Sequence, residues 1–299
     1  MYVKPTAPRS IGGVLDDGLR LWRDSLPTTW QLAFLAQLLV TVPLVLFRLQ
    51  LKDMPVLPTP SSMSAANAQL MLSLMKSPMF WLTYAAVVLA SIGFYNAVLL
   101  RIAAVSTNSA ISVGRSLASG FRLLPRVIWL FIILVLAVFL IGIVAAVVGA
   151  VAGRMGGQTG TAAVPVTMIL LLLFFGFLLG RIVLASIALI VENARAIESL
   201  KASWVLTRGH WWRCAAILTV LIIIGVVLSI VVAFVNGLVA VSLGPTSAVS
   251  IALTQILSIL TNTVLGPLYP AVLLAIFDDL KLRKEGGDLA SRVSALAPP

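Results

Sequence analysis

The residue types that most often carry catalysis are scarce in this sequence. It has one histidine, His210, and one cysteine, Cys214. A histidine-based metal cluster or a Ser-His-Asp arrangement is hard to build around a single histidine. A single cysteine excludes an internal disulfide. The sequence therefore indicates a protein that is not an enzyme.

Carboxylates gather in one stretch, near the C-terminal end. The acidic residues there are Asp278, Asp279, Glu285 and Asp288. They could together hold a cation, but basic residues are interleaved with them, namely Lys281, Arg283 and Lys284. Such mixing is typical of a solvated helix end whose charges pair with one another. We therefore expect no metal site and no cofactor.

The basic residues indicate a different chemistry, the binding of anionic lipid headgroups. Lys and Arg outnumber Asp and Glu by 21 to 10, and the formal net charge is +11. Six basic residues beside apolar stretches are candidates to hold headgroups: Arg115, Arg122, Arg126, Lys201, Arg208 and Arg213. Trp204, Trp211 and Trp212 should anchor at the same depth, because an indole buries its ring while its N–H stays wet. Nucleic acid is a poor alternative partner, since no separate basic domain exists to hold it.

Polar residues within the apolar stretches form a second set of candidates. Burying them in lipid is costly, so they either line an interior pocket or serve the fold. The candidates are Asn96, Arg101, Arg181, Asn236, Gln255, Asn262 and Tyr269. Arg181 either extends to the cytoplasmic interface or faces a polar cavity with Arg101. The amides either line that cavity or join helices by hydrogen bonds.

The elements that must position these residues are membrane-spanning helices. The chain is 60% hydrophobic and only 10% charged, whereas a soluble domain has about 25% charged residues. Runs long enough to cross a hydrocarbon core, about 20 residues, occur near 28–48, 79–104, 126–152, 164–191, 211–241 and 248–277. They lack the alternation of barrel strands, so we predict an all-α integral membrane protein with six transmembrane helices. Gly266-Pro267 and Pro270 should kink or break the last one.

The distribution of Lys and Arg predicts the orientation of these helices. Sixteen of them lie in the N-terminal segment, the second and fourth connectors and the C-terminal tail. Four lie on the other side, namely Arg48, Lys52, Lys76 and Arg154. The positive-inside rule then makes both termini cytoplasmic, with 49–78 as the main outer loop. The N-terminal segment also lacks the apolar core of a cleavable signal peptide.

Three cytoplasmic segments share the pattern of an amphipathic interfacial helix. They align as Leu15-Asp-Asp-Gly-Leu-Arg-Leu, Leu117-Ala-Ser-Gly-Phe-Arg-Leu and Leu200-Lys-Ala-Ser-Trp-Val-Leu. An apolar face backed by basic residues is typical of a helix that lies flat in a membrane interface.

The chain is then a single membrane domain, 1–299, made of repeated units. Three parallel helix–span–span repeats would cover about 10–104, 110–191 and 194–277, with a cytoplasmic tail at 278–299. Parallel repeats imply a pseudo-rotation axis along the membrane normal. The alternative is that the three segments are ordinary amphipathic connectors of a multispan protein.

Two stretches resemble known bacterial membrane families. They are VENARAIESLKASWVLTRGHWWR, residues 191–213, and AIFDDLKLRKEGGDL, residues 275–289. Both are similar to the membrane domain found beside some bacterial glycerophosphoryl diester phosphodiesterases, and to YciC-like inner-membrane proteins. Two departures are Phe277, where tyrosine is common, and Gly287, where an aromatic residue is usual. The resemblance implies an α-helical membrane fold in the bacterial cytoplasmic (inner) membrane, and little about activity.

These observations favour a non-enzymatic inner-membrane protein that binds or helps to move lipids or other amphiphiles through a basic cytoplasmic collar. Its expected partners are anionic membrane lipids. The resemblance adds an alternative, a membrane scaffold or regulatory subunit that docks a soluble cytoplasmic partner such as a phosphodiesterase. A small-solute transporter is a weaker alternative, because the apolar runs lack interior carboxylates.

Overall fold

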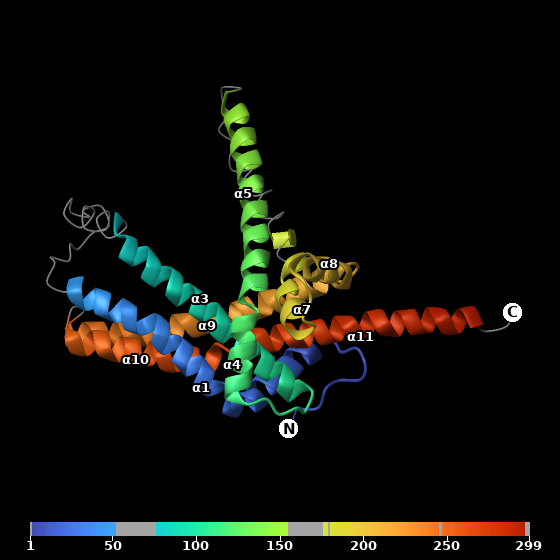
Figure 1. Cartoon of the computed structure of the whole chain (residues 1–299), viewed down its shortest axis with the longest axis horizontal. Coiled ribbons are helices and arrows are strands. Elements are labelled where there is room, and N and C mark those ends of the chain that lie inside the picture. The colour runs from blue at the N-terminus through green and yellow to red at the C-terminus, as the bar shows by residue number, and fades with distance from the viewer. Residues whose placement is uncertain (1, 52–75, 155–175, 179, 245–246, 297–299) are drawn as a thin grey trace. The chain divides into compact units, whose positions relative to one another are not determined.

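The computed structural model describes residues 2–51, 76–154, 176–178, 180–244 and 247–296, and within these ranges every regular element is a helix (Figure 1). The prediction of an all-α chain is confirmed for these residues. The helices are α1 (Ile11–Leu51), α3 (Pro78–Ser106), α4 (Val113–Arg122), α5 (Leu124–Arg154), α7 (Ala185–Val191), α8 (Ala196–Thr207), α9 (Trp211–Leu243), α10 (Ala248–Leu265) and α11 (Leu268–Leu296).

Within the described residues, four helical stretches are long and apolar enough to cross a membrane. They are Pro78–Ser106, Leu124–Val151, Trp211–Leu243 and Ala248–Lys284. In the most apolar part of Leu124–Val151 no residue is buried within the protein. An apolar stretch of this length with no buried residue suits lipid as its solvent.

The other two predicted spans are not among these four. The first, 28–48, lies inside the 41-residue helix α1. The fourth, 164–191, lies partly outside the described residues, and its described part includes a shorter apolar helix over Gly176–Val191. The total of six therefore stays a prediction.

The last predicted span is interrupted where its sequence indicated. Helix α10 ends at Leu265, and α11 begins at Leu268. Pro267 has no N–H to continue the helical ladder, while the N–H of Gly266 still donates to the carbonyl of Asn262 at 2.8 Å. The predicted break at Gly266-Pro267 is confirmed.

The chain divides into two compact units, which we describe separately. The first contains Met1–Leu21, Leu123–Leu221 and Ala271–Pro299, and the second contains Trp22–Arg122 and Ile222–Pro270.

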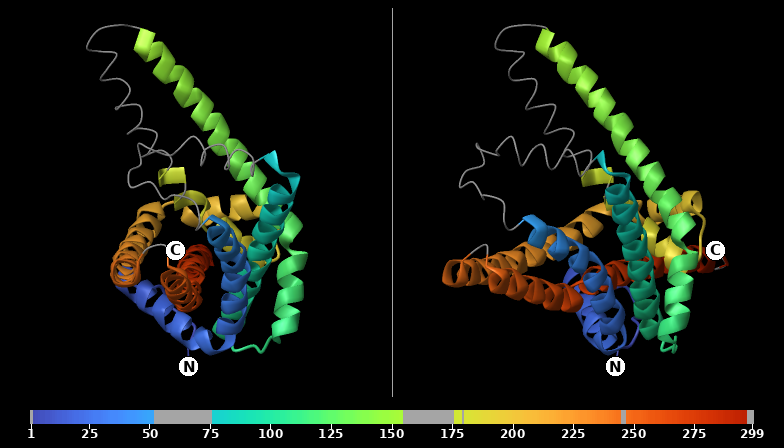
Figure 2. Two further views of the ribbon diagram at one scale, coloured as in Figure 1. Left: turned by 90° about the vertical axis from the view of Figure 1, so that its left-hand side faces the viewer. Right: turned by 60° about the vertical axis from the view of Figure 1, so that its left-hand side comes forward.

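In the second unit, α4 lies directly against α3 (Figure 2). A Cβ built on Gly120 of α4 would lie 2.6 Å from the carbonyl oxygen of Gly93 and 2.8 Å from the nitrogen of Ala97. The ring of the next residue, Phe121, covers Gly93 and meets Phe94 edge to face at 6.1 Å. Only glycine at position 120 permits so close an approach of the two backbones.

In the first unit, α8 lies against α7, and a small residue of α8 also contacts the helical segment just before α7. The hydroxyl of Ser203 donates to the carbonyl of Arg181 at 2.6 Å, and Ser203 is fully buried. Helix α8 ends at Thr207, and Gly209 then adopts a left-handed conformation (φ +87°) that turns the chain into α9. That conformation is open to glycine and strained for other residues.

The three segments predicted to be amphipathic helices are all helical, but they are not equivalent. The second is α4 and the third is α8, both short and separate. The first is continuous with the rest of α1, so the prediction of a separate helix before the first span is wrong. Pro27 lies inside α1 without ending it, and near it the Thr29 hydroxyl donates to the carbonyl of Ser25 at 3.0 Å.

Candidate functional site

A cluster of aromatic rings around Arg181 is the most distinctive polar site of the first unit. The guanidinium lies 5.2 Å from the centre of the Phe177 ring and 4.7 Å from that of Trp204. Those two rings meet edge to face at 6.4 Å, so the cation lies in the angle between them. Phe177 also meets Trp211 at 5.2 Å, and Trp211 stacks on Trp212 at 4.2 Å. Cation–π contacts of this kind stabilise a partly desolvated guanidinium.

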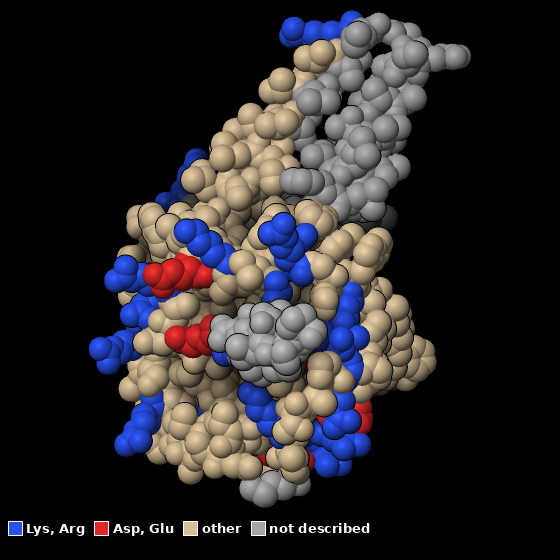
Figure 3. All heavy atoms as spheres, turned by 90° about the vertical axis from the view of Figure 1, so that its right-hand side faces the viewer, with Lys and Arg blue, Asp and Glu red and all other residues tan. Residues whose placement is uncertain are grey.

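Exposed basic side chains on α4 and α8 form the next feature. Arg115 and Arg122 lie on α4, Lys201 lies on α8, and Arg208 follows α8 directly; all four are exposed. None of the four has a carboxylate partner among the described residues. We call these four residues the unpaired cations. Lys and Arg also dominate the charged side chains on the face drawn in Figure 3.

The described acidic side chains, in contrast, form ion pairs or hydrogen bonds with other residues of the chain. The described acidic side chains and their partners are Asp16 with Arg20, Asp17 with Arg9, Asp24 with Arg23, Glu192 with Lys281, Glu198 with the N–H of Arg195, Asp278 with Lys4, and Asp279 with Arg213 and Arg283. The positive charge of the unpaired cations is therefore not neutralised by the described part of the chain.

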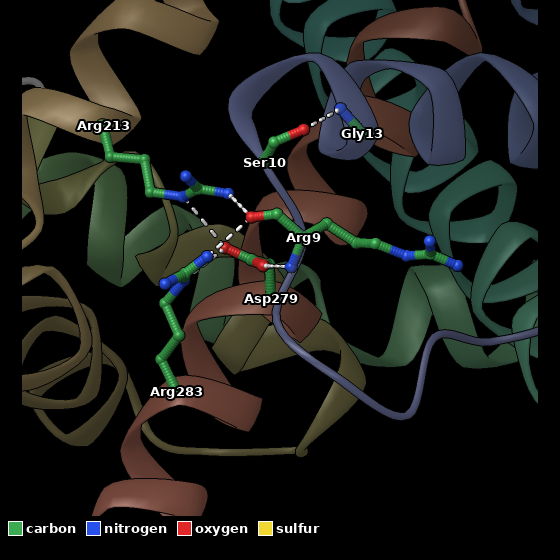
Figure 4. Close-up of polar contacts among 6 residues, drawn as sticks. All are labelled: Arg9, Ser10, Gly13, Arg213, Asp279 and Arg283. Atoms are coloured by element: carbon green, nitrogen blue, oxygen red, sulfur yellow. Dashed lines mark hydrogen bonds and ion pairs between the residues drawn. The ribbon is translucent and has the colours of Figure 1, made fainter.

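The best-satisfied carboxylate is Asp279 of α11, in the first unit (Figure 4). Its Oδ2 accepts hydrogen bonds from Nε of Arg213 and Nε of Arg283, both at 3.0 Å, and its Oδ1 accepts one from the backbone N–H of Arg9 at 2.8 Å. Nη2 of Arg213 and Nη2 of Arg283 both donate to the backbone carbonyl of Arg9. The Asp279 side chain is only 5% exposed. This arrangement joins the N-terminal segment to α9 and α11; we call it the Asp279 cluster.

The Asp279 cluster changes the interpretation of two predicted features. Asp278 and Asp279 pair with basic residues, but both are buried and not solvated. The side chains of Glu285 and Asp288 lie outside the described part of the chain. Arg213, a candidate for binding headgroups, has its guanidinium directed at Asp279 and is 17% exposed. Arg126, another candidate, is exposed and donates to the carbonyl of Asn193 at 3.1 Å.

The N-terminal segment is also fixed by a second ion pair next to the Asp279 cluster. Lys4 Nζ lies 2.8 Å from Oδ1 of Asp278. Tyr2 is buried, and burial, with further effects of Asp17 and Asp278, raises the pKa of its hydroxyl above the ordinary value. Burial likewise raises the pKa of the Asp17 carboxyl, against the opposing effect of Arg9.

The predicted interior residues differ from one another in burial and in hydrogen bonding. Asn96 is fully buried, and its amide donates to the carbonyl of Gly120 at 3.1 Å, as expected for a bond between helices. Nη1 of Arg101 is buried without a partner in the described chain. Asn262 is exposed and donates to the carbonyl of Ser258 at 2.9 Å.

The seven interior candidates are divided between the two units. Arg181 lies in the first unit, and the other six lie in the second. Asn236 and Gln255 are half-buried, and Tyr269 is 43% exposed. A shared pocket for these residues remains a prediction.

Sequence analysis missed two groups of residues at these sites. It assigned no role to Phe177, although Phe177 and Arg181 are four residues apart and so share one face of a helix. It also missed Lys4 and Arg9 as partners of the two C-terminal aspartates. No local pattern indicates those contacts, because Lys4 and Asp278 are 274 residues apart in the chain.

The fold and these sites define the class of the protein as an all-helical membrane protein, with four stretches of membrane-crossing length and composition. Residues 29–280 match the model of a family described as a domain of unknown function, DUF7847, so the chain belongs to that family. No curated protein and no solved structure matches the chain. The resemblance to phosphodiesterase-associated and YciC-like membrane proteins stays a prediction.

Proposed function

We propose that this protein is a non-enzymatic protein of the bacterial cytoplasmic membrane that binds or helps to move lipids or other amphiphiles. The observation that supports this most directly is the set of unpaired cations. Arg115, Arg122, Lys201 and Arg208 are exposed, whereas every described acidic side chain is already bonded within the chain. Exposed cations beside apolar helices attract anionic headgroups.

The apolar surface of α8 supports the same proposal. Ile197 is 55% exposed, Trp204 is 43% exposed and Val205 is 54% exposed. Lys201 is on the same helix. Exposed apolar and aromatic side chains next to basic ones suit a membrane interface, where the apolar groups enter the acyl region and the charges meet the headgroups. We therefore propose that α8 lies at the cytoplasmic membrane surface.

The proposed topology is six spans with both termini in the cytoplasm. With Cys214 replaced by serine, a single cysteine at Ser291 should react with a membrane-impermeant thiol reagent only after the cells are opened. A single cysteine at Ser62 should react in intact cells. The reason is the concentration of Lys and Arg on the proposed inner side. Labelling of Ser291→Cys in intact cells would reverse the orientation.

We further propose that the three segments descend from one repeated unit. The aligned positions 18, 120 and 203 hold Gly, Gly and Ser, and each residue is closely packed on a helix. A Cβ on Gly18 would lie 2.9 Å from Val272 of α11, Gly120 packs on α3, and Ser203 bonds to Arg181. Helices α3 and α7 are also each followed, after one capping residue, by a left-handed asparagine: Asn108 (φ 51°) and Asn193 (φ 55°).

Lipid binding is tested by neutralising two of the unpaired cations. The Arg115→Gln/Arg122→Gln variant should bind phosphatidylglycerol about 30-fold more weakly, because each basic side chain near an anionic surface contributes roughly 1 kcal/mol. The binding should also weaken with salt. The measurement is lipid retention by native mass spectrometry on detergent-purified protein, over a series of salt concentrations.

The matched control is Lys76→Gln/Arg154→Gln, which removes two exposed charges from the proposed outer side. It should bind phosphatidylglycerol as the parent does. Both variants must first show unchanged cysteine labelling, so that a change in topology is not read as a loss of binding. Equal retention by the parent and Arg115→Gln/Arg122→Gln at every salt concentration would contradict the proposal and favour the scaffold alternative.

A further inference from the structure

We infer that Arg181, in the corner formed by Phe177 and Trp204, is a recognition residue for a phosphate group, for which an anionic phospholipid is the membrane source. The inference rests on the proposed lipid-binding function and adds to it a residue outside the unpaired cations. Arg181 differs from an ordinary surface cation because contacts with neighbouring residues hold its guanidinium in one position.

Helix α8 positions Arg181 in three ways. The helix that carries Arg181 is interrupted at Val183 and Leu184, before α7 begins. Ser203 of α8 donates to the Arg181 carbonyl at 2.6 Å, which satisfies an acceptor beside the interruption. The adjacent residue, Trp204, places its ring 4.7 Å from the guanidinium and accepts a long hydrogen bond from Nη1 at its carbonyl, 3.4 Å away. The backbone and the side chain of Arg181 are thus both held by α8.

The charge of Arg181 is not neutralised within the described part of the chain. It forms no ion pair there. Within the described residues its Nε is buried without a hydrogen-bond partner, and its guanidinium donates one hydrogen bond, the long one to the Trp204 carbonyl. A half-buried guanidinium with unused N–H groups favours an anionic ligand.

The geometry favours a bidentate contact between the planar guanidinium and a phosphate. The Phe177 and Trp204 rings lie against the guanidinium and its Nε is buried, so a ligand approaches the edge formed by Nη1 and Nη2, where Nη2 donates no hydrogen bond within the described residues. Two N–H groups of one edge match two oxygens of a phosphate. Trp212, which stacks on the neighbouring Trp211, is 71% exposed. An exposed indole in the same aromatic cluster suits the boundary between headgroups and acyl chains.

In the second unit, the corresponding helices are α3 and α4, and they pack at Gly120 with no arginine in that contact. There the aligned residues are Gly120 and Phe121 of α4, and the ring of Phe121 packs on Gly93 and Phe94. The amide nitrogen of the neighbouring polar side chain, Asn96, donates a hydrogen bond to the carbonyl of Gly120. The contact at Gly120 is therefore formed without a cation, although α3 also carries Arg101, whose Nη1 is buried without a partner in the described chain.

The experiment measures phosphatidylglycerol binding by native mass spectrometry for Arg181→Gln, Arg181→Lys and the control Arg154→Gln. Arg181→Gln should bind about tenfold more weakly than the parent, because a charge-assisted, two-point contact is lost. Arg181→Lys keeps the charge but not the planar fork, and should recover only part of the affinity. Arg154→Gln makes the same charge change on the proposed outer side and should bind as the parent does.

The source of the phosphate is distinguished by competition with inorganic phosphate. If excess phosphate displaces phosphatidylglycerol from the parent but not from Arg181→Gln, the ligand is free phosphate; if it displaces none, the ligand is the lipid. Equal phosphatidylglycerol binding by the parent, Arg181→Gln and Arg181→Lys would overturn the inference. The proposed function would still stand if Arg115→Gln/Arg122→Gln lost binding. Should Arg181→Gln fail to fold, judged by its melting temperature, Arg181→Lys carries the test.

Discussion

Replacing Asp279 with asparagine should lower the free energy of unfolding by about 3–5 kcal/mol, the usual cost of removing one partner from a buried ion pair. Asp279 accepts from Arg213, Arg283 and the N–H of Arg9. An asparagine keeps the shape of the side chain but replaces one acceptor oxygen with an NH₂ donor. If that group faces the two guanidinium groups, donors oppose donors, and two cations lose their common anion.

The measurement is unfolding of the purified protein in mixed micelles with increasing SDS, followed by tryptophan fluorescence. The matched control is Asp16→Asn. Asp16 forms an exposed pair with Arg20 at 2.8 Å, with side chains 55% and 62% exposed, and such pairs contribute less than about 1 kcal/mol. Similar stability losses for the two variants would show that the Asp279 cluster does not hold the N-terminal segment in place.

The Asp279 cluster also shows where sequence-based prediction fails. Arg213 follows Trp211 and Trp212, so its local sequence is that of a cation at the membrane surface. Its partner Asp279 is 66 residues away in the chain, and Arg9 is 270 residues from Asp279. Periodicity and composition describe neighbours along the chain and do not identify pairs that only tertiary packing brings together. The sequence therefore predicts that Arg213 is charged, but not that it pairs with Asp279.

Helices were predictable because their signals are local. An uninterrupted apolar run such as that of α5 has one stable backbone conformation in lipid, since its N–H and C=O groups must bond to each other. Gly266-Pro267 marks a break for an equally local reason, the missing N–H of proline. The continuity of α1 through Pro27 was not predictable in this way, because a proline within a helix is tolerated or not according to its surroundings.

The site around Arg181 was partly predictable. A charged residue within an apolar run is costly, and this identified Arg181 as unusual. The sequence left open whether it extends to the interface or faces a cavity. The structure gives it two aromatic neighbours, of which Phe177 is local and Trp204 comes from a separate helix. Of the two, only Phe177, four residues from Arg181 in the chain, can be identified from the sequence.

Replacing Gly120 with alanine should cost about 3 kcal/mol of stability, at the upper end of the usual cost of overpacking. The added Cβ would lie 2.6 Å from the carbonyl oxygen of Gly93 and 2.8 Å from the nitrogen of Ala97. Both atoms belong to the backbone of α3, so no side chain can rotate away to relieve the contact. Helix α4 must move off α3, which also lengthens the hydrogen bond from Asn96 to Gly120.

The control for Gly120→Ala lies on the same short helix. Gly114 of α4 has no atom within 4 Å of its ideal Cβ, so Gly114→Ala adds a methyl group in open space. Because alanine loses less backbone entropy than glycine in a helix, that variant should be neutral or more stable by up to about 1 kcal/mol. SDS titration of both variants separates the two effects. A stability change of the same sign and size for Gly120→Ala and Gly114→Ala would mean that α4 does not pack on α3 through Gly120, and it would remove one of the three small-residue contacts on which the proposed repeat depends.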